Sequence, residues 1–204
     1  MFVANQRQNH MKILLPFISA LLVLMTTNAQ TTYTLSNGEL TIEGTSTMHD
    51  WTATTTSLDG EGAFIFEKGI PVSIEKLKVT TKAKSIKSEK GSTMDKNMYK
   101  ALNADKYPTL TFVLTNVDYF RKNGTSYDVK ITGKLTVAGT TKTVSITGKG
   151  TQAGTGISFS GNFKLKMTDF NVEPPSLFFG TLNTGDDITI RYRASFSPTG
   201  YGSR

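Results

Sequence analysis

The sequence predicts an all-β protein, and three observations favour this fold class. Apolar and polar residues alternate along many short segments, most clearly in residues 133–146, which form two alternating runs around Gly139. Thr, Gly and Lys are abundant, and apolar residues come in short runs. Turn signals separate the runs. Because each strand has one apolar face, about eight to ten strands must close into a barrel or stack as two sheets.

The first 29 residues are expected to be a secretory signal peptide rather than part of the fold. Met11-Lys12 precedes an apolar run over residues 13–25, and small residues then offer a cleavage position after Ala29. The run is too short for a permanent span, so no transmembrane segment is expected in the mature protein. Residues 30–204 are predicted to form one domain. This domain is expected in the periplasm, and secretion from the cell is the alternative.

Composition excludes several classes of function. The chain has no Cys, which excludes a lipoprotein anchor, disulfides and thiolate chemistry. Loss of the signal peptide leaves 21 basic and 16 acidic residues, a net charge of +5 that suits anionic surfaces without identifying a partner. The sequence contains no phosphate-binding loop and no dinucleotide fingerprint. His49 is the only histidine left after cleavage, so no metal site is expected.

Four strands are predicted in the N-terminal half, at residues 39–43, 52–56, 63–66 and 76–84. Asn37-Gly38 predicts a turn before the first of these strands. The lysines that alternate along the last strand favour a solvated outer face over a nucleic-acid site. No nucleic-acid partner is therefore expected.

Residues 92–102 form the one predicted helix. Met94 and Met98 recur at helical spacing, and Ser92 stands three residues before Asp95, as in a capping box. The helix would close one end of the sheet structure. Met94 and Met98 would then either pack there or line the mouth of a ligand site.

The C-terminal half continues the alternation. Predicted strands lie at residues 110–114, 127–137, 143–146, 157–167 and 188–192, and the fourth of them shifts face near Gly161. Asn123-Gly124 and Gly139 mark hairpin turns. Before the last strand, a long excursion carries Phe170, Pro174-Pro175 and an apolar cluster at residues 177–179.

Residues 46–51, Ser-Thr-Met-His-Asp-Trp, stand out because they hold the only Trp and the only histidine of the mature chain. In one interpretation Trp51 fills the core while His49 and Asp50 hydrogen-bond a loop. In another, His49 or Asp50 meets the polar head of a ligand. An enzyme that uses His49 and Asp50 is a weaker third interpretation, because catalytic triads are assembled from separate segments.

Four stretches resemble the YceI-like, polyisoprenoid-binding family of bacterial envelope proteins, in a Bacteroidetes-like variant. They are the His-Asp-Trp segment at 46–51, the helix and Lys-Tyr-Pro strand at 95–112, the Gly-x-Leu-Thr hairpin at 133–144 and the Asp-Phe strand end at 164–170. Familiar members carry Arg-Asp and His in the helix, where this chain has Met94-Asp95 and Met98. The insert at 174–180 resembles a subgroup feature.

The resemblance implies an elongated, lipocalin-like antiparallel β-barrel of about eight strands, with an apolar tunnel for a long isoprenoid or similar lipid. Burying one CH₂ group is worth about 0.8 kcal/mol, whereas association costs roughly 4–15 kcal/mol, so a tunnel without strong polar groups needs a long chain. The candidate ligand-binding residues are Met48, His49, Trp51, Phe64, Phe66, Met94, Met98, Leu110, Phe112, Leu114, Leu135, Val137, Phe163, Leu165, Phe170 and Phe178. Each of them could equally be plain core.

The sequence therefore favours a periplasmic carrier without catalysis, whose ligand is a long-chain lipid such as a polyisoprenoid or a quinone-like lipid, and which has no other cofactor. The alternative is a structural or stress-related envelope domain with a filled barrel, whose lysine faces meet anionic partners. A contiguous apolar cavity would favour the carrier. The identity of the lipid and the formation of a homodimer stay open.

Overall fold

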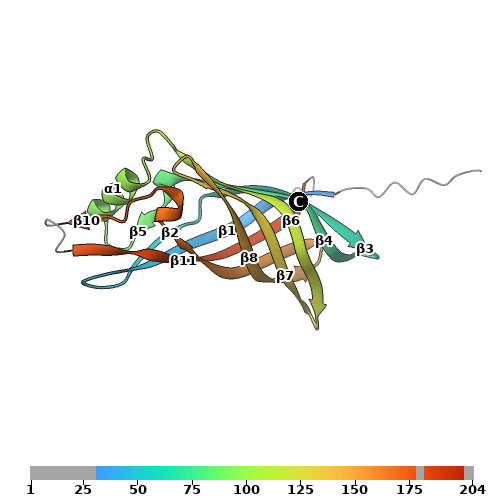
Figure 1. Ribbon diagram of the computed structural model, residues 1–204. Helices are drawn as coiled ribbons and strands as arrows, with labels where there is room; N and C mark the ends of the chain where they lie inside the picture. Colours follow the sequence, from blue (N-terminus) through green and yellow to red (C-terminus); the bar gives the residue numbers. More distant parts are fainter. Residues whose placement is uncertain (1–30, 178–181, 200–204) are drawn as a thin grey trace, which may run out of the picture.

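The computed structural model describes residues 31–177 and 182–199 and confirms the all-β prediction (Figure 1). Its elements are β1 (Thr31–Ser46), β2 (Trp51–Thr55), β3 (Leu58–Glu67), β4 (Ile70–Lys82), η1 (Ala83–Ser85), β5 (Lys87–Ser88), α1 (Ser92–Ala101), β6 (Thr109–Asn123), β7 (Ser126–Val137), β8 (Thr140–Ala153), β9 (Gly156–Lys166), η2 (Thr168–Phe170), β10 (Ser176–Leu177) and β11 (Leu182–Pro198). The predicted signal peptide and Phe178 lie outside the described residues.

Eight of the strands form one closed antiparallel barrel. Their order is β1, β3, β4, β6, β7, β8, β9 and β11, and β11 pairs back with β1. Closure turns the apolar face of every strand toward a common interior and leaves few free edges. The predicted elongated barrel of about eight strands with one short helix is confirmed (Figure 1).

One end of the barrel is extended by short elements. The start of β1 pairs with β3, whereas residues 40–44 of β1 pair with β2, which in turn pairs with β5. Helix α1 contacts β5, and β10 pairs with the start of β11 at the same end (Figure 1). We call this end the mouth and define it by β5, α1, η2 and β10.

The polar face of α1 is fixed to β5. The Asp95 carboxylate accepts a hydrogen bond from the Ser88 N–H at 2.7 Å and lies 3.5 Å from the Lys87 ammonium. The helix N-cap is Gly91, and it makes no side-chain hydrogen bond. The predicted capping box of Ser92 and Asp95 is wrong, because the backbone of β5 engages the Asp95 carboxylate instead.

The hairpin between β7 and β8 has the tight turn that the sequence predicted. Ala138 and Gly139 both have positive φ angles, 47° and 79°. Two consecutive left-handed residues are what a type I′ turn requires, and its twist matches that of the flanking strands. Gly139 has a second role, since a Cβ atom there would lie 2.5 Å from the Tyr107 ring.

The turn predicted at Asn37-Gly38 is wrong, because these residues lie inside β1. The pairing of β1 with β11 shifts by one residue between Leu35 and Asn37, which marks a bulge. A Cβ atom on Gly38 would come 2.8 Å from Cδ1 of Leu58. The glycine therefore permits a close approach between strands rather than a reversal of the chain.

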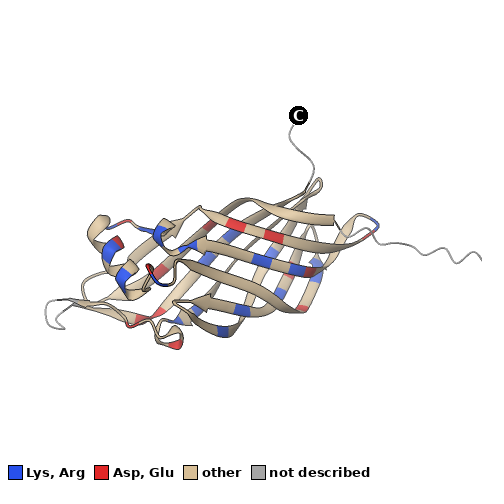
Figure 2. Cartoon of the chain, turned by 90° about the horizontal axis from the view of Figure 1, so that it is seen from above, with Lys and Arg blue, Asp and Glu red and all other residues tan. Residues whose placement is uncertain are grey.

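Charged residues are spread along the strands of the barrel (Figure 2). The lysines predicted on one outer face, Lys76, Lys78, Lys82 and Lys84, are all exposed. Because alternation places the intervening residues inside, the same strand supplies Leu77 and Val79 to the interior.

Aromatic rings fill the barrel interior at the end away from the mouth. Tyr33 meets Phe64 edge-on with ring centroids 4.9 Å apart, and Phe64 stacks on Phe159 at 5.8 Å. Such ring pairs add roughly 0.5–1.5 kcal/mol each beyond their burial. We call this cluster the aromatic plug, and its members are Tyr33, Phe64, Phe66, Phe120, Tyr127, Phe159 and Phe196.

Candidate functional site

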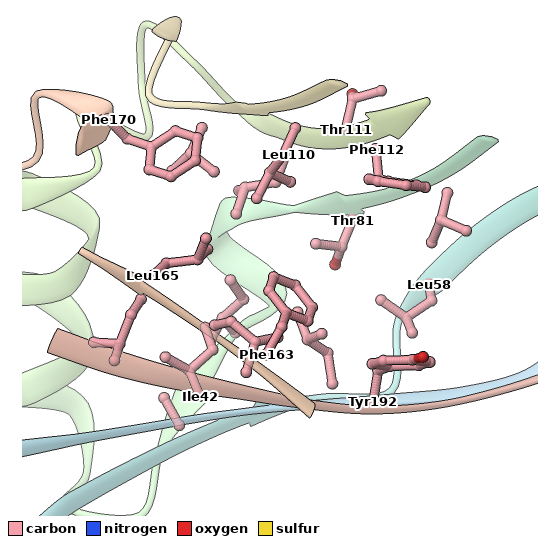
Figure 3. A pocket seen from close by; sticks show the side chains of 18 of the residues that line it. Ile42, Leu58, Thr81, Leu110, Thr111, Phe112, Phe163, Leu165, Phe170 and Tyr192 are labelled. Atoms are coloured by element: carbon pink, nitrogen blue, oxygen red, sulfur yellow. The ribbon is translucent and has the colours of Figure 1, made fainter. Parts of the chain in front are cut away.

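Between the aromatic plug and the mouth, the barrel encloses an apolar cavity of about 270 Å³ (Figure 3). For comparison, an apolar cavity of roughly 150 Å³ stays dry and binds benzene. The barrel wall, α1 and η2 all contribute side chains to the lining. Figure 3 shows side chains from opposite walls directed at one common space, among them Ile42, Leu110, Phe163, Leu165 and Phe170.

The buried polar groups and the charged groups around the cavity have partners. The Thr81 hydroxyl donates a hydrogen bond to the Ser57 carbonyl at 2.8 Å. The two charged residues of the lining are exposed and ion-paired, in the pairs Lys166–Asp187 and Arg193–Glu39. Within residues 31–177 and 182–199, no buried side-chain nitrogen or oxygen lacks a hydrogen-bond partner. The walls therefore favour a hydrocarbon over a polar solute.

Tyr192 contributes a ring rather than an ionisable group to the cavity. Its hydroxyl donates a hydrogen bond to the Thr147 carbonyl at 3.3 Å, and its ring centroid lies 6.4 Å from that of Phe163. Burial raises the pKa of Tyr192 to about 12. The phenol is therefore neutral at physiological pH.

Trp51 lines the cavity close to the mouth. Its indole lies over Gly44 of β1, where a Cβ atom would come 2.3 Å from Cζ2 of the indole. The indole N–H donates a hydrogen bond to the Thr45 carbonyl at 3.1 Å. Gly44 and this hydrogen bond hold the ring in place, so Trp51 is both packed and part of the lining.

The loop that precedes Trp51 faces solvent. Met48 has 67% of its surface exposed, and His49 and Asp50 are also exposed. The Ser46 hydroxyl donates to the His49 carbonyl at 2.7 Å and accepts from the His49 N–H at 3.3 Å. The loop is thus held through the backbone of His49, and its imidazole lies outside the cavity lining.

The cavity brings together ten of the predicted ligand-binding residues: Trp51, Met94, Met98, Leu110, Phe112, Leu135, Val137, Phe163, Leu165 and Phe170. Phe64 and Phe66 lie in the aromatic plug instead, and Leu114 packs against the core without lining the cavity. Met48 and His49 are exposed in the loop between β1 and β2. The contacts of all these residues with a ligand stay a prediction.

Several lining residues were not among the predicted ones. Ile42, Leu77, Val79, Ile188 and Tyr192 all border the cavity. Their strands show the same alternation of apolar and polar residues that identified the predicted lining residues. This alternation could have placed their side chains on the inward face. Alternation alone does not reveal how far along each strand the cavity extends.

Two further properties concern metals and membranes. The described residues contain no group of three or more His, Asp or Glu side chains placed to hold a metal ion. In the same ranges, no helix is both long and apolar enough to cross a bilayer.

Solved structures from three bacteria share the fold of this chain. The Burkholderia cenocepacia protein BcnA is 20% identical with a TM-score of 0.58, over 78% of this chain and 95% of that chain. A polyisoprenoid-binding domain from Saccharophagus degradans, implicated in plant cell wall breakdown, is 12% identical with a TM-score of 0.62, over 83% and 99%. The Campylobacter jejuni YceI protein is 25% identical with a TM-score of 0.53, over 69% and 81%.

Sequence comparison identifies the family. No curated protein matches this chain. The model of the YceI-like domain, however, matches residues 33–196, which include all four stretches that suggested the resemblance and nearly the whole barrel. The chain therefore belongs to the YceI-like family.

Proposed function

We propose that the protein binds and carries a long-chain isoprenoid or a similar lipid in the barrel cavity, and that it performs no chemical step on this cargo. The observation that carries the proposal is the apolar cavity, because aliphatic and aromatic side chains make up most of its lining and the buried polar side chains of the described residues have hydrogen-bond partners. Membership of the YceI-like family and the likeness to a polyisoprenoid-binding domain support the choice of lipid. The predicted signal peptide supports a periplasmic location.

The apolar lining suits the hydrocarbon tail, and the head group would stay at the mouth. A lipid tail that buries about ten CH₂ groups in the cavity gains ~8 kcal/mol. Association costs roughly 4–15 kcal/mol, so a tail much shorter than this would not offset the cost. Since the walls are mostly apolar, tail length and shape must dominate binding.

Two other functions fit the structure less well. A structural or stress-related envelope domain with a filled barrel accounts for the aromatic plug but leaves the cavity unexplained. The enzyme interpretation gains no support from the positions of His49 and Asp50, which are exposed beside the mouth. Unchanged lipid binding by a His49→Ala variant would agree with a cavity that works without the imidazole.

The experiment is the identification of the bound lipid. Residues 30–204 are purified from a bacterial periplasm, extracted with organic solvent and analysed by mass spectrometry. The proposal predicts a long-chain lipid at close to one molecule per protein, either as purified or after incubation with polyprenols and isoprenoid quinones. A clean extract after both treatments would favour the structural domain.

A further inference from the structure

The net positive charge of the described residues is concentrated at one side of the mouth. Residues 82–106, which run from the end of β4 through η1, β5 and α1, carry seven lysines and three carboxylates, a net of +4. All other described residues together carry thirteen basic and thirteen acidic side chains. Figure 2 shows lysine positions on α1 at this end of the molecule.

Ion pairs within the segment leave its helix lysines unneutralised. Each of the three carboxylates faces a lysine of the same segment, in the pairs Lys84–Asp105, Lys87–Asp95 and Lys90–Glu89. Lys96 and Lys100 are exposed and have no carboxylate partner among the described residues. Their ammonium groups are therefore available to an external anion.

The two faces of α1 have different roles. Met94 and Met98 on the inner face line the cavity. Lys96 and Lys100 are four residues apart, so they lie together on the outer face of the helix. Like charges at this spacing repel and weaken an isolated helix. A helix that covers the cavity thus presents a cationic surface outward at some cost to its own stability.

We propose that the outer face of α1 docks on the anionic head-group layer of a membrane, with the mouth close to the bilayer where a lipid enters or leaves. The inference rests on the proposed function. Lysine clusters are attracted to anionic lipid surfaces, and the attraction fades within a Debye length of about 8 Å at physiological salt. Lys96 and Lys100 meet this requirement because both are exposed and their helix α1 lies at the mouth end of the barrel (Figure 1).

The rest of the mouth orients the docked molecule. Residues 168–177 and 182–187, which include η2, β10 and the start of β11, contain four acidic residues and no Lys or Arg, and only Asp187 among them pairs with a lysine, Lys166. An anionic surface repels this segment and attracts α1, so the protein tilts with the helix toward the membrane. Met48, 67% exposed in the loop between β1 and β2, offers an apolar side chain at the same end.

The test is binding of the mature protein to vesicles in a flotation assay. Vesicles of phosphatidylglycerol mixed with phosphatidylcholine are compared with vesicles of phosphatidylcholine alone. Wild-type protein is expected to bind only the anionic vesicles, and less at high salt. The Lys96→Glu/Lys100→Glu variant should lose at least tenfold in affinity. The control, Lys68→Glu/Lys122→Glu, makes the same charge change on two exposed lysines in the hairpins at the other end of the barrel, and should lose less than twofold.

Three outcomes would overturn the inference. Wild-type protein could fail to bind anionic vesicles, or it could bind neutral vesicles equally well. The two variants could also lose the same affinity, which would mean that only the net charge of the protein matters. Thermal unfolding of each variant confirms that it is folded. Occupation of the cavity is measured separately. The protein is loaded with lipid from detergent, and the lipid that it retains is then extracted and quantified. Retained vesicle binding with an empty cavity would refute the proposed cargo but not the docking, and a filled cavity without vesicle binding would refute only the docking.

Discussion

The hydroxyl group of Tyr192 packs directly against Gly148, since a Cβ atom built on Gly148 would come only 2.2 Å from the hydroxyl oxygen. Tyr192 on β11 is paired with Gly161 on β9, which is paired in turn with Gly148 on β8. Two neighbouring glycines therefore let the tyrosine cross two strands and reach the Thr147 carbonyl. This arrangement holds the ring against the cavity wall.

Replacing Gly148 should disturb this arrangement. In Gly148→Ala the new methyl group would also lie 2.7 Å from the Ser160 carbonyl, so both the tyrosine and the backbone must shift. We expect the free energy of unfolding to fall by about 1–3 kcal/mol, as for other overpacked sites, in urea denaturation. Gly156→Ala is the control, because its nearest atom would be 3.4 Å away. Equal stability of the two variants would contradict the close approach.

The raised pKa of Tyr192 predicts a loss of stability in alkali. Burial favours the neutral phenol in the folded state, with a pKa of about 12, whereas in the unfolded chain the pKa is about 10. The contribution is present below pH ~10 and is lost as the pH rises toward the folded value. Urea denaturation of wild type and Tyr192→Phe across this range should show the steeper decline in wild type. Parallel curves would mean that Tyr192 ionises normally.

Asp186 should make the start of η2 sensitive to acid. Its carboxylate accepts hydrogen bonds from the Thr168 hydroxyl at 2.7 Å and from the Thr168 N–H at 2.9 Å, and these bonds lower the pKa of Asp186. The stabilisation is present above the ordinary carboxyl pKa and is lost as the pH falls through the lowered value. Hydrogen exchange should show a protected Thr168 N–H in wild type and an unprotected one in Asp186→Ala. Asp187→Ala, which removes only an exposed partner of Lys166, should keep the protection.

Trp51 should report cavity loading directly. It is the only Trp of the chain and lines the cavity, so its emission depends on what lies inside. Titration with a quinone that carries an isoprenoid tail is expected to quench Trp51 fluorescence to saturation at one equivalent. A tail-less quinone at the same concentrations should quench weakly and without saturation. Identical quenching by both compounds would indicate contact from solvent.

Phe159 should limit the length of tail that the cavity accepts. Its ring belongs to the aromatic plug and also borders the cavity, so it forms part of the floor. A Phe-to-Ala change in a core costs about 3–5 kcal/mol, so Phe159→Leu is the milder test. With mixed polyprenols, this variant should retain longer chains than wild type by mass spectrometry. Phe66→Leu, in the plug but outside the lining, should leave the length distribution unchanged.

The sequence was sufficient to predict the fold class, the helix and the hairpin at Ala138-Gly139, because each depends on local patterns. Gly38 shows the limit of such patterns. A glycine after an asparagine signals a turn, but here it accommodates Leu58 from another strand. Asp95 shows the same limit, because its partner Ser88 becomes available only once β5 lies beside α1.

The extent of the cavity was not predictable for a related reason. Alternation correctly placed both Phe64 and Phe163 inside the barrel. Phe64 meets Phe159 and fills space, whereas Phe163 borders the cavity. The difference depends on which rings from distant strands meet after closure, and no single strand carries that information. Ten of the predicted residues thus share the cavity, and the remainder lie in the plug, the core, the exposed loop or outside the described residues.

The most direct test of the central claim compares two tryptophan substitutions on β6. Leu110 points into the cavity (Figure 3), whereas Val113, three residues along the same strand, is 40% exposed on the outside. Equilibrium binding of an isotope-labelled polyprenol is measured for Leu110→Trp, Val113→Trp and wild type. We predict that Leu110→Trp loses at least tenfold in affinity while Val113→Trp binds like wild type. Equal binding by all three folded proteins would contradict a lipid site inside the barrel.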